Sequence, residues 1–250
     1  MSIVFDTVSF SYDGANSVLQ DLSAEIPSGS FVLIGGANGA GKSTLLRLLN
    51  GLIRPTAGRV LIEASDTRAT PTSGLAATVA VTFQNPSDQL FAPTVFKEAV
   101  FGPRNLGRQH PEDDARTALN LLGLGEYVGR HPYDLSPALQ RLLTVASAVA
   151  MGSPFLAFDE PSVGLSQPER EILKSALRTL SKEGRSLIIV SHDFEFFLPL
   201  CERVLILAQG GIGFQGSPGE MLDRHRDIRK AGIRLPISVR LAHRARLPLS

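Results

Sequence analysis

The segment that most constrains the fold is the glycine-rich run GANGAGKST at residues 36–44. It follows FVLIGG (31–36), a short apolar run typical of a buried strand. It leads into KSTLLRLLNGL (42–52), whose apolar residues recur at helical spacing before Gly51, the expected C-cap. Glycines at such a junction let successive main-chain N–H groups face inward at the positive end of the helix, where they bind a phosphate. The segment therefore predicts an α/β fold that holds a phosphorylated ligand.

The same run satisfies the pattern G-x-x-x-x-G-K-[ST], in which different residue types have different roles. Lys42 is expected to neutralise β- and γ-phosphate oxygens, and the Ser43 hydroxyl to ligate Mg²⁺. The alternative is an ordinary glycine-rich turn, which the flanking strand and helix argue against. The predicted nucleotide-binding residues are Gly36, Ala37, Asn38, Gly39, Ala40, Gly41, Lys42, Ser43 and Thr44.

A second buried strand ends in two carboxylates. FLAFDE (155–160) has four apolar residues followed by Asp159 and Glu160. Because ligands of such sheets bind at the carboxyl ends of the strands, Asp159 is predicted to bind the Mg²⁺ and Glu160 to polarise an attacking water. On its own, an apolar strand that ends in Asp-Glu is more often structural. The preceding phosphate loop favours the catalytic interpretation.

The third candidate is His192, in the run Ser191-His192-Asp193 directly after SLIIV (186–190). From a strand end it would face the ligand crevice, where it is expected to contact the γ-phosphate or hold the attacking water. A lone histidine after a strand is usually a surface residue. Its position after the other two motifs favours a role as a γ-phosphate sensor.

Regular patterns elsewhere predict an extra β layer and a helical segment. Imperfect alternation in 3–10 and 18–26, with Asp13-Gly14 as a turn between them, indicates an N-terminal antiparallel layer. ATPTSG (69–74) is expected to be a loop. The other predicted strands are 59–64, 78–83 and 203–208. The predicted helices are 94–101, 111–124, 137–151 and those near 167–182 and 193–200. Strands that alternate with helices after residue 155 predict a mainly parallel sheet.

Composition restricts the classes of function. Twenty-five Lys and Arg residues against 24 Asp and Glu give a net charge of +1, so no global field attracts the chain to nucleic acid or to an anionic bilayer. The single cysteine, Cys201, excludes a disulfide framework and fits a reducing compartment. The sequence has no apolar run of about 18 residues, and MSIVFDTVSFSYDG lacks the features of a signal peptide. We therefore expect a cytoplasmic protein that serves a membrane, if it serves one, from outside the lipid.

Five motifs resemble, in this order, those of ATP-binding-cassette (ABC) ATPases: GANGAGKST, FQNP (83–86), LSPALQR (135–141), FLAFDEPSVGL (155–165) and SHD (191–193). The resemblance implies a P-loop NTPase with a RecA-like α/β core and an antiparallel β subdomain. It places one ABC ATPase domain at 1–222, with a helical subdomain inserted at about 94–151. Residues 223–250 then form a basic C-terminal appendage, either a helical piece with a solvated face or a segment that docks a partner.

The same resemblance implies cofactors and further site residues. ATP and Mg²⁺ are the implied cofactors, with Tyr12 stacking on adenine and Gln84 contacting the Mg²⁺ and the attacking water. Taken alone, Tyr12 is equally an aromatic residue of a β-strand. The implied reaction is ATP hydrolysis by positioning and charge stabilisation. Its implied catalytic residues are Gln84, Glu160 and His192, and its implied metal ligands are Ser43, Asp159 and Gln84.

Residues 83–107, FQNPSDQLFAPTVFKEAVFGPRNLG, are similar to the corresponding region of energy-coupling-factor (ECF) importer ATPases, the cobalt, nickel and vitamin uptake group. This similarity implies a peripheral ATPase at the cytoplasmic face of the cell membrane. Its implied partners are a transmembrane coupling subunit and a substrate-binding membrane protein, and no nucleic acid. Phe91 and Phe96 lie in the stretch expected to dock on a coupling helix. The alternative is an amphipathic surface loop and helix.

Two motifs depart from the family pattern. The family's LSGGQ is Leu135-Ser136-Pro137-Ala138-Leu139 here, and Pro137 has no N–H group. In the second motif, Ser166 stands in place of the usual aspartate after Gly164-Leu165. In an ABC dimer, each ATP lies between the glycine-rich loop of one subunit, called Walker A, and the LSGGQ segment of the other, called the signature. We therefore expect a heterodimer with a second ABC ATPase rather than a homodimer. The alternatives in function are a regulatory cassette subunit with low turnover and a soluble ABC ATPase outside transport.

Overall fold

The computed structural model describes residues 2–224, 228–229, 232–233 and 235–245. The chain divides into two compact units, one formed by Met1–Leu75 with Ile188–Ser250 and the other by Ala76–Leu187. Helix α2 (Thr72–Thr78) and strand β8 (Ser186–Val190) carry the chain across the two boundaries.

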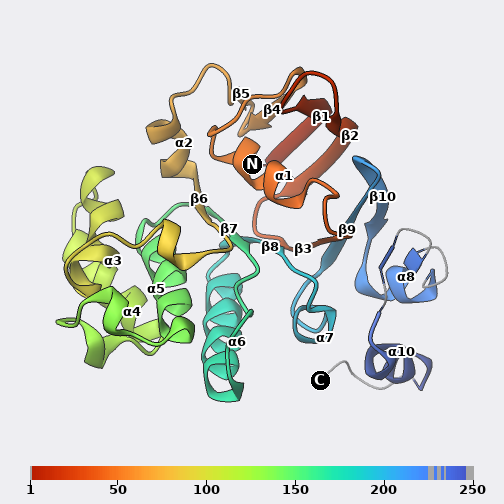
Figure 1. Ribbon diagram of the computed structural model, residues 1–250. Helices are drawn as coiled ribbons and strands as arrows, with labels where there is room; N and C mark the ends of the chain where they lie inside the picture. Colours follow the sequence, from red (N-terminus) through yellow and green to blue (C-terminus); the bar gives the residue numbers. More distant parts are fainter. Residues whose placement is uncertain (1, 225–227, 230–231, 234, 246–250) are drawn as a thin grey trace. The chain divides into compact units, whose positions relative to one another are not determined.

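The first unit contains an antiparallel sheet in the order β2-β1-β4-β5 (Figure 1). Its strands are β1 (Ser2–Ser11), β2 (Ser17–Pro27), β4 (Ala57–Ile62) and β5 (Ser65–Asp66). Ile3 of β1 pairs with Ile26 on one side and with Ile62 on the other, so apolar side chains lie opposite one another across the strands. Buried and more exposed positions alternate along most of β1, which is the period of a strand covered on one face. The predicted antiparallel layer is confirmed.

A second set of strands in this unit carries the glycine-rich loop. β3 (Phe31–Gly36) pairs in parallel with β9 (Arg203–Ala208), and β10 (Gly211–Gly216) pairs with β9 in the antiparallel sense. The first five residues of β3 are buried, as expected for a continuous apolar run in a parallel sheet. Helix α1 (Lys42–Leu49) follows β3 and buries five side chains. The other helices described in this unit are α7 (Phe194–Phe197), α8 (Pro218–Asp223) and α10 (Ile237–Arg244).

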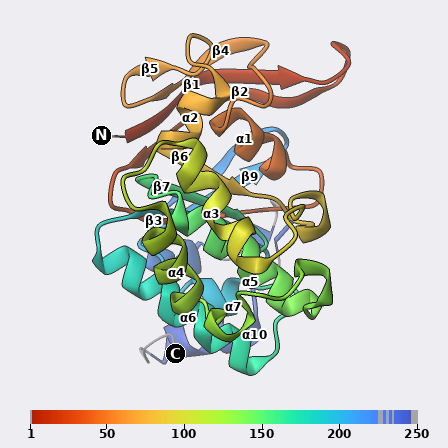
Figure 2. The same ribbon diagram turned by 90° about the vertical axis from the view of Figure 1, so that its left-hand side faces the viewer.

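The second unit combines a parallel strand pair with packed helices (Figure 2). β6 (Val79–Thr82) pairs with β7 (Phe155–Asp159). The helices that follow one another in sequence between these strands are η1 (Pro86–Asp88), α3 (Val95–Asn105), α4 (Pro111–Leu121), η2 (Gly125–Tyr127), η3 (Pro132–Asp134) and α5 (Pro137–Ala150), and α6 (Gln167–Lys182) follows β7. Helices α3, α4 and α5 all contact one another. The α/β fold class is confirmed, and the domain limits remain predictions.

Three parts of the chain differ from the expectations. ATPTSG (69–74) is not all loop, because α2 begins at Thr72; its seven residues bury only Leu75 and so have no apolar periodicity. The segment 193–200 forms only the single-turn helix α7, and Pro199, which follows it, has no N–H group with which to extend the helical hydrogen bonds. Strand β10 is unexpected, because GIGFQG buries only Phe214 and is held in the sheet by pairing with β9.

Two helix ends follow local capping rules. Asn50 is the C-cap of α1, and Gly51 in the next position has φ of 69°, one residue later than expected for the cap. Ser217 and Glu220 form a capping box at the start of α8, a helix too short to be revealed by apolar periodicity.

The C-terminal segment has a packed face and an exposed apolar face. Helix α10 contacts α8, Val239 is buried, and the Ser238 hydroxyl donates to Glu195 Oε1 at 2.7 Å. Ile237 and Leu241 are exposed. Within the predicted appendage, residues 225–227, 230–231, 234 and 246–250 lie outside the described residues.

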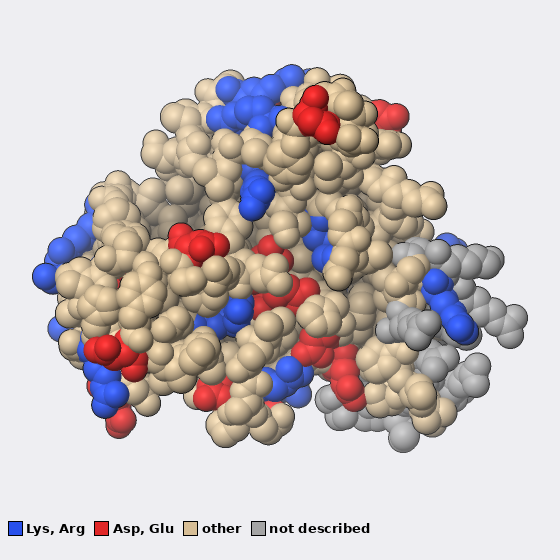
Figure 3. Space-filling view, in the orientation of Figure 1, with Lys and Arg blue, Asp and Glu red and all other residues tan. Residues whose placement is uncertain are grey.

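Charged side chains lie mainly at the surface. On the face in Figure 3, Lys and Arg are interspersed with Asp and Glu among a larger area of uncharged residues. Ion pairs such as Arg59–Asp6 (2.9 Å) and Arg104–Glu112 (2.6 Å) join exposed partners. Solvent and salt screen such exposed pairs, so stability rests mainly on buried apolar side chains. None of the helices in the described part of the chain combines the length and the apolar character that crossing a membrane requires.

Candidate functional site

The glycine-rich loop of the first unit has the backbone that a phosphate site requires. Gly39 and Gly41 have φ of 80° and 94°, in the left-handed region that glycine adopts without a Cβ clash. A Cβ atom at Gly41 would lie 2.5 Å from Leu19 Cδ2, so the loop also passes β2 too closely for a side chain. Leu45 N donates to Gly41 O at 2.9 Å, which places the loop directly before the first turn of α1. The loop therefore fits an anion bound at a helix N-terminus.

Lys42 and Ser43 occupy the first turn of α1. Lys42 Nζ donates hydrogen bonds to the main-chain oxygens of Gly36 (2.8 Å) and Ala37 (3.0 Å), which holds the ammonium group at the loop. Ser43 and residues 37–39 are exposed. A cation and a hydroxyl thus lie at the positive end of a helix, a donor set that suits nucleotide phosphates and a hard metal ion.

A pocket of about 730 Å³ opens beside the loop. Residues 37–40 line it together with Ser17, Val18 and Gln20 of β2, and residues 208–210 and Gly232 complete the lining. Its volume lies in the range of small-molecule sites.

Tyr12 lies next to α1. Its hydroxyl is 3.3 Å from Thr44 Oγ1 and accepts a hydrogen bond from Arg47 Nη1 at 3.2 Å. Its ring packs edge-to-face on Phe10, with centroids 4.8 Å apart, yet the residue remains 57% exposed. The ring therefore has a free area for stacking while the hydroxyl is tied to the helix of the phosphate loop. Arg47 is a contact that sequence reasoning did not single out.

His192 lies beside the strand that leads into the loop. Ser191 N donates to Ile34 O at 3.1 Å, which sets the end of β8 next to β3, two residues before Gly36. Asp193 N donates to the Ser191 hydroxyl at 3.1 Å, and His192 itself is exposed. The first unit therefore contains the loop, Tyr12 and His192.

The second unit brings the other three predicted residues to one sheet edge. β6 and β7 run in parallel with Thr82 opposite Phe158, so Gln84 and Asp159 both follow carboxyl ends of neighbouring strands. Asp159 and Glu160 are buried, and Gln84 is exposed. Gln84, which the family resemblance implied, is thus grouped with Asp159 and Glu160, which the strand-end argument predicted.

Glu160 has an unusual backbone conformation. Its φ is 51°, in the left-handed region, although it is not a glycine. Such a conformation costs about 1–3 kcal/mol and is found where the surrounding structure over-determines it, often at functional sites. Glu160 is also only 6% exposed. A buried carboxylate in a strained backbone is consistent with a catalytic role.

Arg141 was not predicted as a site residue, yet it contacts this edge. From α5, its Nη1 donates to Gln84 O at 2.8 Å and to Glu160 O at 3.2 Å. Burial lowers the pKa of the Arg141 guanidinium, and the nearby charges of Glu160 and Asp159 oppose that shift. No pattern of residue types in the sequence marks this contact, because both acceptors are main-chain oxygens.

The chain matches a family model described as ABC transporter over residues 19–163, more than half of its length. This chain belongs to the ABC transporter family. The energy-coupling factor transporter ATP-binding protein EcfA of Methanothermobacter thermautotrophicus is 36% identical over 244 residues, which cover 96% of this chain and 78% of the relative. EcfA2 of Symbiobacterium thermophilum is 35% identical over 255 residues, with 98% and 88% covered. The expected family resemblance is confirmed.

Solved structures agree with the fold. The structure of cbiO1 from Clostridium perfringens, described as part of the ABC transporter complex cbiONQ, superposes with a TM-score of 0.80 at 26% identity and covers 98% of each chain. The chain is therefore the ATP-binding subunit of an ABC transporter, and its cassette is of the ABC ATPase type.

The altered ABC signature forms the start of α5. Ser136 is the N-cap, and its hydroxyl accepts a hydrogen bond from Leu139 N at 3.3 Å. Pro137 occupies the first helical position, where it provides no N–H group. This helix end therefore has fewer main-chain donors for an anion than a glycine-containing signature would have.

The second altered position, Ser166, has a local role. It caps α6 and forms a capping box with Glu169, whose side chain accepts from both the Ser166 N–H (2.9 Å) and the Ser166 hydroxyl. Serine and aspartate are both good N-caps, so the start of α6 does not require aspartate. The substitution alters what this loop presents to solvent without loss of the cap.

The stretch that begins at Gln84, here called the docking segment (residues 84–93), is held by several side chains, one of which is Arg141 through its bond to the Gln84 oxygen. Glu98 is buried, and its Oε2 accepts from Phe91 N (3.0 Å) and Ala92 N (2.8 Å). Gln89 Oε1 accepts from Phe83 N at 3.1 Å. The Tyr133 hydroxyl donates to Leu90 O at 2.8 Å. The segment thus has a fixed shape within the second unit.

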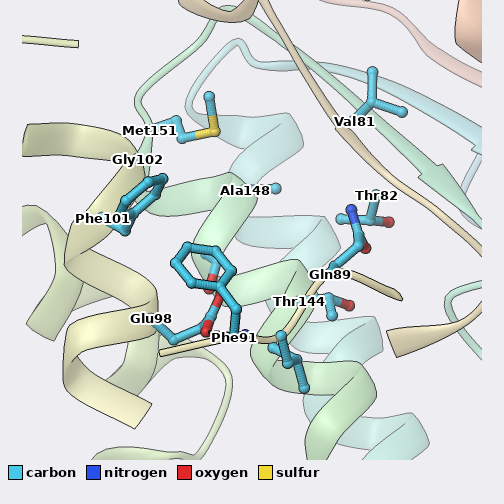
Figure 4. A pocket seen from close by; sticks show the side chains of 12 residues that line it. Val81, Thr82, Gln89, Phe91, Glu98, Phe101, Gly102, Thr144, Ala148 and Met151 are labelled. Carbon is cyan, nitrogen blue, oxygen red and sulfur yellow. Dashed lines mark hydrogen bonds between the residues drawn. The ribbon is translucent and has the colours of Figure 1, made fainter. Parts of the chain in front are cut away.

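Two aromatic side chains stand out on this segment and on α3. Phe91 and Phe101 are 62% and 48% exposed, and their rings pack edge-to-face with centroids 4.8 Å apart. They border two cavities of about 210 and 300 Å³ (Figure 4 shows the first). Phe96 is different from the expectation: it is partly buried, and the Arg116 guanidinium covers its ring at 4.8 Å. Phe101, rather than Phe96, is therefore the second exposed aromatic residue beside Phe91.

Proposed function

We propose that this chain is the ATP-hydrolysing subunit of an ECF-type importer for a vitamin or a transition-metal ion. The observation that most supports hydrolysis is that Glu160, directly after Asp159, is a buried carboxylate with a left-handed backbone conformation. Dead cassettes commonly lack a carboxylate here, so its presence favours turnover over a purely regulatory role. The relatives named as ECF transporter ATP-binding proteins support the importer type.

Each predicted residue has a role in this proposal. The glycine-rich loop and Lys42 bind the phosphates, Tyr12 stacks on the adenine, and His192 senses the γ-phosphate. Glu160 accepts a proton from the attacking water, and Gln84 orients that water. Bound Mg²⁺ would neutralise charge on the phosphate oxygens.

The residues present fit Mg²⁺. Among the described residues, no group of three or more His, Cys, Asp or Glu side chains is arranged to hold a metal ion. Mg²⁺ commonly keeps waters and binds one or two protein oxygens together with substrate phosphates. Ser43 in one unit and Asp159 and Gln84 in the other each have an oxygen donor of that kind, which is what the proposal requires of them.

We assign the membrane contact to the docking segment. Phe91 and Phe101 form an exposed apolar area between two cavities, in a region whose main chain Glu98 and Tyr133 hold in place. Exposed apolar patches of this kind mark sites of protein association. A transmembrane coupling subunit would bind here, with a substrate-binding membrane protein in the same complex. The chain would then lie at the cytoplasmic face of the membrane as a peripheral subunit.

We further propose a heterodimer with a second ABC ATPase. The residues that act on this chain's own ATP are all present, whereas Pro137 weakens the anion site that this chain offers to its partner's ATP. A homodimer would have two weakened sites, and a heterodimer one complete site. The altered signature also supports the second candidate function, a regulatory cassette with low turnover. It does not support a soluble ATPase outside transport.

ATP turnover by the purified chain, alone and with the membrane proteins that copurify with it, tests the proposal. Glu160→Gln should retain ATP binding and lose hydrolysis by at least about a hundredfold, the scale of a lost general base. Transport by the reconstituted complex, assayed with vitamins and with cobalt or nickel ions, tests the importer assignment. Equal turnover by the variant and the unsubstituted chain would contradict the role of Glu160, and low turnover in every complex would favour the regulatory alternative.

A further inference from the structure

Arg141 is a partly buried cation for which the proposed reaction has no role. Its Nη1 donates to the main-chain oxygens of Gln84 (2.8 Å) and Glu160 (3.2 Å). The first oxygen belongs to the chain after β6 and the second to the chain after β7, and these two strands pair in parallel. One side chain from α5 therefore joins the two strand ends that carry Gln84 and Glu160.

This position is energetically unfavourable for an arginine. Arg141 Nε is buried and has no hydrogen-bond partner among the described residues. The residue lies in the second turn of α5 and is partly buried, so its charge is partly removed from water. A side chain that violates local preferences in this way indicates a compensating role, and the two hydrogen bonds from Nη1 identify it.

We propose that Arg141 is a positioning residue that fixes the main chains of Gln84 and Glu160 relative to each other. The inference rests on the proposed function, in which these two residues act on the attacking water. Glu160 has φ of 51°, which a non-glycine residue keeps only where its surroundings hold it. The hydrogen bond from Arg141 to the Glu160 oxygen is one such contact. The same guanidinium also fixes the start of the docking segment through its bond to the Gln84 oxygen.

Three substitutions separate the guanidinium's hydrogen bonds from its charge and bulk. Arg141→Leu removes the hydrogen bonds and the charge. Arg141→Gln removes the charge and retains a shorter neutral donor, and Arg141→Lys retains the charge and one donor group. We expect Leu and Gln to lower kcat by about tenfold to a hundredfold, the scale of a misplaced catalytic group, with the ATP Kd changed by less than about twofold. The Kd should be spared because the guanidinium donates to the oxygens of Gln84 and Glu160 and not to the phosphate loop. Lys should restore part of the lost kcat.

Amide hydrogen exchange on the nucleotide-free chain gives a readout independent of activity. In Arg141→Gln, the amides of residues 83–85, 160, 162 and 163 should exchange faster, while those of α6 remain as in the unsubstituted chain. Arg178→Gln, an exposed arginine of α6, is the matched control and should change neither kcat nor exchange.

A kcat within about twofold of the unsubstituted chain for Arg141→Leu would overturn the proposal. Faster exchange spread evenly over the second unit, together with a matching loss of thermal stability, would overturn it as well, because Arg141 would then be only structural. Absence of ATP hydrolysis by the unsubstituted chain with its partners would contradict the proposed function. The local exchange at residues 83–85, 160, 162 and 163 would still decide whether Arg141 holds the two strand ends.

Discussion

The Tyr133 hydroxyl donates a hydrogen bond of 2.8 Å to the main-chain oxygen of Leu90. Tyr133 belongs to η3 and lies two residues before the altered signature, whereas Leu90 lies directly before the exposed Phe91. The surface proposed to meet the membrane partner and the helix start proposed to face the second ATPase are therefore joined within one unit. This contact offers a direct physical link between partner binding and the signature.

Tyr133→Phe should loosen that link. The change removes only the hydroxyl, so we expect a loss of about 0.5–1.5 kcal/mol in unfolding free energy, the range for one hydrogen bond, and faster amide exchange at 87–91. Urea unfolding and hydrogen exchange provide the measurements. Tyr127→Phe is the matched control, because Tyr127 contacts the Arg130 guanidinium through the face of its ring, which phenylalanine retains. Equal effects of the two substitutions would show that the Tyr133 hydroxyl contributes nothing specific.

Charge on the aromatic pair should disrupt the membrane complex. Phe91→Glu and Phe101→Glu place carboxylates at the exposed apolar area, where they would be desolvated on docking. We expect copurification with the membrane partner and transport to be lost, while ATP binding and the melting temperature are retained. Leu52→Glu, at an exposed apolar position of the other unit, is the control. If the complex survives and stability falls instead, the two rings belong to the core of the helical group.

Removal of the loop cation should weaken nucleotide binding itself. Lys42→Ala should raise the Kd for ATP by about tenfold to a hundredfold, the equivalent of losing a charge-assisted hydrogen bond of about 1.5–3 kcal/mol. Titration with a fluorescent ATP analogue measures the Kd, and Lys182→Ala, at an exposed position of α6, is the control. An unchanged Kd would exclude Lys42 from the phosphate site.

Asymmetry of the ATPase pair can be tested by replacing the glutamate that follows the Walker-B strand, Glu160 in this chain, in each subunit in turn. With a partner that carries the usual signature, Glu160→Gln should abolish nearly all turnover of the pair, whereas the partner's equivalent change should do little. Restoring the family pattern with Pro137→Gly, Ala138→Gly and Leu139→Gln should raise turnover of this chain alone. Equal losses from the two Walker-B changes, or fast turnover by the unaltered chain alone, would mean that the altered signature is functionally neutral.

The single thiol should be inert in the native protein. Cys201 is buried, and its burial raises the pKa of the thiol to about 12, so the reactive thiolate is scarce at pH 8. We expect iodoacetamide at pH 8 to leave the folded chain unmodified and to label it rapidly in guanidinium chloride. Rapid labelling without denaturant would show that the segment around Cys201 opens readily.

Features that depend on local chain chemistry were predictable from the sequence. FVLIGG forms β3 over the predicted residues, because a strand covered on both faces needs a continuous apolar run. The left-handed glycines of the phosphate loop and the helix that follows are also local properties of GANGAGKST. Placing Asp159 and Glu160 at a ligand-facing edge needed only the rule that parallel strands end there, whereas Gln84 came from the family resemblance. In contrast, α2 and β10 bury so few side chains that they leave no periodic signal.

The tertiary structure alone decided which side chains hold the site. Arg141 contacts the oxygen of Gln84 across 57 positions of sequence, and Tyr133 contacts that of Leu90 across 43. Both bonds end on main-chain carbonyls, which every residue type has, so no residue pattern marks the acceptor. In the same way, the helical period of 95–105 places Phe96 and Phe101 on α3 without showing that Arg116 covers one ring. Which long side chain reaches which carbonyl or ring is set by the packing of α3, α4 and α5, and that packing is absent from any single segment of the sequence.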